Sequence, residues 1–211
     1  LSVCGRSEGG DAWGRGERGC PSDGRMLRGV WVQRVGMATS PGKRYEPRPG
    51  EIPEGLRGLI GASPGNPSGT MLGREELQGV ASACEDRGIA LVSDEIYHGL
   101  HYDRNAVSAL ELTDEVYVIN SFSKYFSMTG WRMGWMVVPE AHVRIVERLA
   151  QNMFICPPHA SQIAALAAPG CEAELEANRA VCAENRRMML NELPKIGFSK
   201  IAPPDGAFYI Y

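Results

Sequence analysis

The sequence contains no apolar run that approaches the roughly 20 residues needed by a membrane-spanning helix. Its opening residues, LSVCGRSEGG, also lack the apolar core of a secretory signal peptide. The net charge of -3 provides no general attraction to nucleic acid or to an anionic membrane surface. These absences argue against membrane and nucleic-acid partners.

The cysteines form no CxxC pair. All six are scattered along the chain, as Cys4, Cys20, Cys84, Cys156, Cys171 and Cys182. In a chain of this length, that pattern indicates reduced thiols in a cytoplasmic protein rather than a disulfide scaffold or a zinc site. His98, His101 and His159 have no cysteine or carboxylate partners at metal-ligand spacing, so no metal site is predicted.

What is present is ordinary for a soluble globular protein, with 44% apolar and 22% charged residues. The length of 211 residues suits one domain and part of a second. Residues 1–50 differ from the rest because they hold 11 of the 25 glycines. They are consistent with a flexible basic tail or a degraded piece of the fold. A phosphate-binding glycine loop is disfavoured, because no GxGxxG or GxxxxGK(S/T) pattern lies between a strand and a helix.

Apolar runs rich in β-branched residues predict a series of strands. They cover residues 56–63, 89–92, 116–119 and 134–138, and the closing GAFYIY run predicts one more. Helical spacing of apolar residues predicts helices between them, over residues 74–87, 140–154, 160–168 and 172–193.

Two of the predicted helices have a clear apolar face. In the first helix this face is formed by Leu77, Val80, Ala81 and Cys84. In the second it is formed by Val143, Val146, Ala150 and Met153. Alternating strands and helices are typical of an α/β sheet.

Polar residues follow three of the predicted strands: Asn66, Asp94 and the segment 121–124. Ligands of α/β sheets bind at the carboxyl edge of the strands, so these groups are expected to lie together. Lys124 lies between two buried strands, and burying its charged amine costs free energy unless the charge is paired, the amine is deprotonated or it forms a covalent bond. A lysine placed in this way can form a Schiff base with a carbonyl compound, most familiarly pyridoxal phosphate.

Three segments then resemble one family, the class I/II aminotransferases, which are fold-type I enzymes dependent on pyridoxal phosphate. They are ASPGNPSGT (62–70), SDEIYHG (93–99) and SFSKYFSMTGWRMGW (121–135), in the order that the family has them. The resemblance implies a mostly parallel sheet sandwiched by helices, followed by the start of a smaller domain. It divides the chain into a degenerate N-terminal part of the large domain (1–50), the cofactor-binding large domain (51–170), and a linking helix with the truncated small domain (171–211).

The resemblance also implies a role for the residues of these segments that match the family's motifs. Lys124 would bind pyridoxal 5′-phosphate as a Schiff base and shuttle a proton, with Asp94 facing the pyridine nitrogen. Tyr97 and Asn66 would hydrogen-bond the ring's 3-oxygen, and Asn66 would precede a cis bond to Pro67. Ser121 and Arg132 would bind the phosphate, and Ser123 would belong to the same cofactor-binding set.

The implied function is transfer of an amino group from an α-amino acid to a 2-oxo acid, in a homodimer. The sequence does not name the amino acid. Cys20 stands where the family usually has an aromatic residue stacked on the cofactor ring. The family's Ser/Gly-rich phosphate loop and the arginine that binds the substrate carboxylate are not found, so the resemblance implies a chain truncated at both ends.

Three alternatives remain. A catalytically impaired aminotransferase-like fragment would explain Cys20 and the unusual first 50 residues. A fold-type I lyase or decarboxylase would share the same lysine chemistry. Ser121 to Lys124 also reads as the S-x-x-K motif of penicillin-binding enzymes, but the accompanying S-D-N and K-T-G tripeptides are missing.

Overall fold

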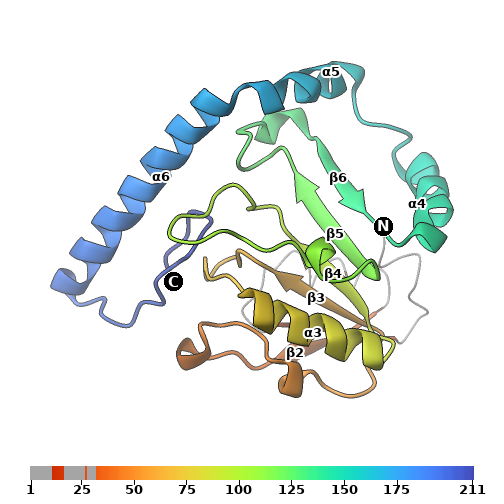
Figure 1. Cartoon of the computed structure of the whole chain (residues 1–211), viewed down its shortest axis with the longest axis horizontal. Coiled ribbons are helices and arrows are strands. Elements are labelled where there is room, and N and C mark those ends of the chain that lie inside the picture. The colour runs from red at the N-terminus through yellow and green to blue at the C-terminus, as the bar shows by residue number, and fades with distance from the viewer. Residues whose placement is uncertain (1–10, 17–26, 28–31) are drawn as a thin grey trace.

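The computed structural model describes residues 11–16, 27 and 32–211. Its centre is a six-stranded sheet in the order β2-β1-β3-β4-β5-β6 (Figure 1). Neighbouring strands from β2 to β5 pair in parallel, and β6 pairs antiparallel to β5. The strands are β1 (Ala12–Gly16), β2 (Gln33–Met37), β3 (Gly58–Ala62), β4 (Ala90–Asp94), β5 (Val116–Ser121) and β6 (Gly134–Val137). The predicted mostly parallel α/β sheet is confirmed.

The predicted helices all form, each within a residue of its predicted ends. They are α3 (Arg74–Asp86), α4 (Glu140–Met153), α5 (His159–Ala167) and α6 (Glu172–Glu192). Short 3-10 turns occupy Pro41–Lys43, Pro49–Glu51, Ala109–Glu111, Thr129–Trp131, Ala168–Gly170 and Leu193–Ile196. Helix α3 ends before Gly88, whose φ of +62° is a left-handed conformation that glycine adopts without steric cost.

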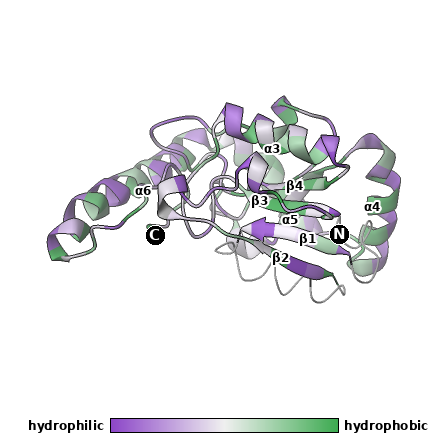
Figure 2. Ribbon diagram, turned by 90° about the horizontal axis from the view of Figure 1, so that it is seen from below, coloured by the Kyte–Doolittle hydropathy of each residue, from purple (hydrophilic) through white to green (hydrophobic). Residues whose placement is uncertain are grey.

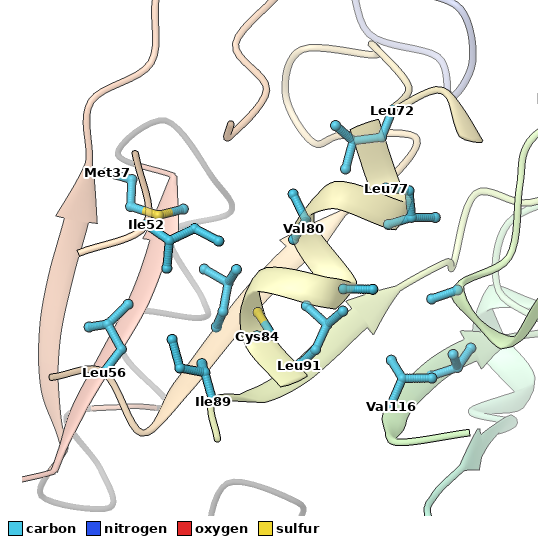
Figure 3. Close-up of a cluster of buried hydrophobic side chains, with 14 residues drawn as sticks. Met37, Ile52, Leu56, Leu72, Leu77, Val80, Cys84, Ile89, Leu91 and Val116 are labelled. Atoms are coloured by element: carbon cyan, nitrogen blue, oxygen red, sulfur yellow. The ribbon is translucent and has the colours of Figure 1, made fainter. Parts of the chain in front are cut away.

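The hydrophobic core lies on both faces of the sheet, because successive side chains of a strand point to opposite sides. On one face, Leu91 and Val116 pack against the apolar stripe of α3, as Figure 3 shows. The predicted α3 residues Leu77, Val80, Ala81 and Cys84 are all buried there. On the other face, Val92 and Tyr117 pack with Trp13. The described cysteines Cys84, Cys156, Cys171 and Cys182 are free thiols.

The helices after β6 are only lightly packed. Helix α4 has no buried residue, although its apolar side chains share one face, and Figure 2 shows hydrophobic and hydrophilic segments side by side along it. Helix α6 extends away from the sheet and buries only Leu175 among its own residues (Figure 1). No helix in the described part of the chain is long and apolar enough to cross a membrane.

The predicted strand at GAFYIY does not form. Gly206 makes an isolated antiparallel bridge to His101, and the chain then turns at Ala207, whose φ is +57°. A left-handed residue interrupts the extended backbone that a strand needs, so the apolar composition misled the prediction. The Asn66–Pro67 peptide bond is cis, as predicted, and the Ser63–Pro64 bond, for which no prediction was made, is cis as well.

Candidate active site

A cavity of about 290 Å³ opens at the carboxyl edge of the parallel strands. Its lining includes Asn66 after β3, Asp94 at the end of β4, Tyr97 just beyond it, and Lys124 in the loop after β5. They include the three residues predicted to be catalytic, Asp94, Tyr97 and Lys124, and Asn66, which was predicted to bind the cofactor. Asn66, Asp94 and Lys124, which follow three separate strands, therefore lie around one cavity.

Lys124 is the one lysine of the chain that lines this cavity. The other three lysines lie elsewhere: Lys43 pairs with Glu51, Lys195 with Glu192, and Lys200 is exposed. The Lys124 Nζ atom lies 5.4 Å from the ring centroids of both Tyr97 and Phe208. Aromatic faces attract an ammonium group at this distance, so the two rings hold the amine at the cavity wall.

Two neighbouring carboxylates at the end of β4 face different surroundings. Asp94 lines the cavity, and its Oδ1 atom accepts a hydrogen bond from the Ile96 amide at 3.1 Å. Glu95 is 2% exposed, and its Oε1 atom accepts hydrogen bonds from Ser93 Oγ and from the Ala109 amide. Glu95 thus anchors the loop before the Ala109–Glu111 turn, while Asp94 is presented to the site.

The remaining predicted cofactor-binding residues, Ser121, Ser123 and Arg132, are not among the described residues that line this cavity. Ser121 Oγ accepts the Ser123 amide at 2.8 Å and donates to the Met133 carbonyl at 3.2 Å. Arg132 is exposed, has a left-handed φ of +55°, and donates to the Thr129 carbonyl at 2.9 Å. Ser123 lines a second cavity, of about 350 Å³, which it shares with Lys124 and Phe208.

The structure adds site residues that the sequence analysis missed. Phe208 packs beside Lys124, and the Tyr209 hydroxyl lies 2.7 Å from that of Tyr97. The aromatic FYIY run could have indicated them, but it was interpreted as a strand. Thr39 and Glu46 line the cavity from the segment between β2 and β3, and no sequence signal pointed to either. Cys20 lies outside the described residues.

Comparison with known proteins identifies the family. Residues 46–211 match the family model described as aminotransferase class I and II. The chain belongs to this family. Its resemblance to class I/II aminotransferases, which the three sequence segments indicated, is thereby confirmed.

The relatives of this aminotransferase chain are about twice its length. It is 42% identical over 209 residues to a valine–pyruvate aminotransferase of Mycobacterium tuberculosis, covering 96% of this chain and 54% of that protein. It is 33% identical over 188 residues to an aspartate aminotransferase of Thermococcus kodakarensis, covering 88% and 50%. A crystal structure of a provisionally assigned aminotransferase from Silicibacter pomeroyi superposes with a TM-score of 0.95 at 55% identity, covering 99% of this chain and 57% of that one. The chain therefore spans about half the length of the relatives it matches.

Class I and II aminotransferases use pyridoxal 5′-phosphate, and the cavity residues fit that group. The lining offers an amine, a carboxylate and a phenol hydroxyl, which suit an aldehyde, a protonated ring nitrogen and a ring oxygen. Two buried lining atoms, Thr39 Oγ1 and Glu46 Oε1, have no hydrogen-bond partner among the described residues. Buried polar atoms are nearly always paired, so these two are suited to a polar ligand or to water. No group of three potential metal ligands occurs in the described part of the chain.

Glu46 gives the stability of the folded chain a pH dependence that an unfolding experiment measures. Burial raises the pKa of its carboxyl to about 7, although Arg44 nearby opposes the shift. The folded chain then binds more protons than the unfolded chain between about pH 4.5, the ordinary value, and about pH 7. We expect the free energy of unfolding to fall as the pH rises through this window, and Glu46→Gln to remove that part of the slope.

Urea unfolding of the chain at several values between about pH 5 and pH 8 measures this slope. Glu174→Gln is the matched control, because Glu174 is exposed and its replacement leaves the cavity intact. An unchanged slope in Glu46→Gln would show that the carboxyl is solvated in the folded chain.

Proposed function

We propose that the protein to which this chain contributes transfers an amino group from an α-amino acid to a 2-oxo acid, with pyridoxal 5′-phosphate bound to Lys124. The observation that carries the proposal is the position of Lys124 at the strand-end cavity, with Asp94 and Tyr97 in the same lining. Membership of the aminotransferase family supports it.

When bound, pyridoxal 5′-phosphate supplies an aldehyde that amines attack and a ring that accepts electrons from the reacting carbon. Lys124 Nζ would hold the cofactor covalently and, once displaced by the substrate amine, accept and return a proton. The Asp94 carboxylate would keep a proton on the ring nitrogen. Tyr97 and Asn66 would donate hydrogen bonds to the ring oxygen, while Ser121 and Arg132 would bind the phosphate, with Ser123 in the same cofactor site.

The substrates are proposed by class. Relatives are named for valine with pyruvate and for aspartate, and these names share an α-amino acid donor. We propose the same class of donor, with a 2-oxo acid as acceptor. We also propose a cytoplasmic homodimer. Sedimentation of a form extended to the length of the relatives measures the oligomeric state, and a monomer at micromolar concentration would contradict the proposed dimer.

A catalytically impaired form is the second candidate function. It is favoured by the hydrogen bond that directs Arg132 to the Thr129 carbonyl and by its exposure, since neither prepares the guanidinium for a phosphate. Spectra identify a form that is impaired because it binds the cofactor poorly or not at all: it stays colourless, whereas a lysine-bound cofactor is yellow and loses its colour on borohydride reduction.

We expect the 211-residue chain alone to turn over at least about 30-fold more slowly than a form extended to the relatives' length. The family's arginine that binds the substrate carboxylate is not found in this chain. Losing one partner of such a charged, hydrogen-bonded pair costs about 2–5 kcal/mol, and each 1.4 kcal/mol is a tenfold change in rate. The measurement adds cofactor, a panel of amino donors and 2-oxoglutarate to both forms. Rates within tenfold of each other would show that this chain already holds the whole catalytic site, and no turnover in the extended form would refute the proposed function.

A further inference from the structure

The Tyr97 hydroxyl is buried against a tyrosine from a distant part of the chain. Tyr97 is 2% exposed, and its oxygen lies 2.7 Å from the hydroxyl oxygen of Tyr209, which is 112 positions further along. The two rings meet edge to face, with centroids 5.7 Å apart and an interplanar angle of 78°. This geometry is a strong O–H···O hydrogen bond, in which either oxygen can be the donor.

The position of Tyr209 is fixed by the backbone that precedes it. The amides of Asp205 and Gly206 both donate to the Gly69 carbonyl, at 2.8 and 2.9 Å, and the Ala207 amide donates to the Leu100 carbonyl at 2.8 Å. The Asp205 carboxylate accepts hydrogen bonds from the Met71 amide at 2.9 Å and from Arg44 at 2.6 Å. The segment that carries Tyr209 is therefore held by backbone hydrogen bonds to the loops that follow β3 and β4.

A phenol hydroxyl has one proton to donate and two lone pairs. Two hydroxyls in contact share one of their protons, so the direction of the shared bond decides where the other proton points. If Tyr209 is the donor, the Tyr97 proton is directed away from Tyr209 and toward an acceptor on the cavity side. Hydrogen bonds in such a chain also strengthen one another.

We propose that Tyr209 is a positioning residue of the active site, whose hydroxyl donates to Tyr97 and so directs the Tyr97 proton to the ring oxygen of the bound cofactor. This inference rests on the proposed function, because it requires a ligand with an anionic oxygen in the cavity. It goes beyond that function in assigning a role to a residue of the C-terminal segment. Tyr209 itself is not required to touch the cofactor.

The experiment measures the pH midpoint of the bound cofactor's absorbance change in the 211-residue chain. A hydrogen bond to the anionic ring oxygen stabilises the deprotonated form and lowers this midpoint, so losing the bond raises it. We expect Tyr209→Phe to raise the midpoint by about 0.4–1 pH unit, in the same direction as Tyr97→Phe and by a smaller amount. Tyr211→Phe is the matched control, because it removes a hydroxyl from the same segment on a ring that packs against Tyr45.

The double variant Tyr97→Phe/Tyr209→Phe tests whether Tyr209 acts through Tyr97. We expect the double variant to have the midpoint of Tyr97→Phe alone, because the second change then has nothing to act on. The thermal midpoint of the cofactor-free chain reports whether each variant folds, and Tyr209→Leu, which also lacks the hydroxyl, must raise the pH midpoint as well.

Each result decides the question. An unshifted Tyr209→Phe midpoint, or additive shifts in the double variant, would overturn the role of Tyr209 while leaving the proposed function in place. A midpoint shift in Tyr211→Phe as large as that in Tyr209→Phe would also overturn the role of Tyr209, because loss of any tyrosine hydroxyl from the segment would then shift the midpoint. If the wild-type chain bound the cofactor without forming the yellow, borohydride-sensitive bond to Lys124, both the proposed function and this inference would be refuted.

Discussion

Replacing Lys124 by alanine is expected to abolish covalent attachment of pyridoxal 5′-phosphate to the chain. The reason is that Lys43, Lys195 and Lys200 do not line the strand-end cavity, so no second amine is placed to take over. Borohydride reduction followed by peptide mapping should label the wild-type chain on the peptide that contains residue 124 and leave Lys124→Ala unlabelled. In a form extended to the relatives' length, turnover should also fall by about 10²–10⁴-fold, the usual contribution of a positioned acid–base group.

Lys200→Ala is the matched control for this experiment, since Lys200 is exposed in the same chain and its removal takes away one amine. Its labelling should equal that of the wild type. Lys124→Arg keeps the positive charge beside the Tyr97 and Phe208 rings, yet it has no amine that forms the covalent bond, so it should also remain unlabelled. Label on another lysine in the wild-type chain would show that the cavity residue is misassigned.

Replacing Asp94 by asparagine is expected to weaken cofactor binding by about 30-fold to several thousand-fold. The carboxylate would otherwise pair with the protonated ring nitrogen, and removing one partner of such a charged pair costs about 2–5 kcal/mol. Asparagine keeps an oxygen acceptor for the Ile96 amide, so the turn after β4 should survive the change. Equilibrium titration of the chain with pyridoxal 5′-phosphate, followed by absorbance, measures the dissociation constant.

Two further variants make the Asp94 result specific. Asp114→Asn removes an exposed carboxylate and should bind cofactor as the wild type does. Glu95→Gln changes the adjacent buried carboxylate, which accepts hydrogen bonds from Ser93 and Ala109, and should lower the stability of the chain more than its affinity. If Asp94→Asn bound cofactor as tightly as the wild type, the ring nitrogen would have to be held by another group.

Much of this protein was accessible from the sequence because it depends on local order. The helical spacing of Leu77, Val80, Ala81 and Cys84 identified both α3 and the face that it buries. Short apolar runs located strands β3 to β6, and the polar residues after them indicated the carboxyl edge as the site. Strand β1 was missed, because AWGRG has neither an apolar run nor an alternating pattern.

The turn from β3 to α3 was also predicted correctly, down to the cis bond before Pro67. Its residues repeat a family segment, and the resemblance supplied what periodicity does not. Lys124, Asp94 and Tyr97 were identified in the same way, and the structure places all three in one cavity lining.

Tertiary structure alone decided which distant residues complete the site. Tyr209 meets Tyr97 because Asp205 to Ala207 dock on the carbonyls of Gly69 and Leu100, and no local pattern encodes a contact across 112 positions. Glu46 acquires its raised pKa from burial, which depends on how the segment after β2 folds over the cavity. A sequence determines the periodicity of its own elements, whereas hydroxyl contacts, burial and charge environments arise when separate elements pack together. For this chain, the sequence determined the sheet and the position of Lys124 in the loop after β5, and packing determined what surrounds that lysine.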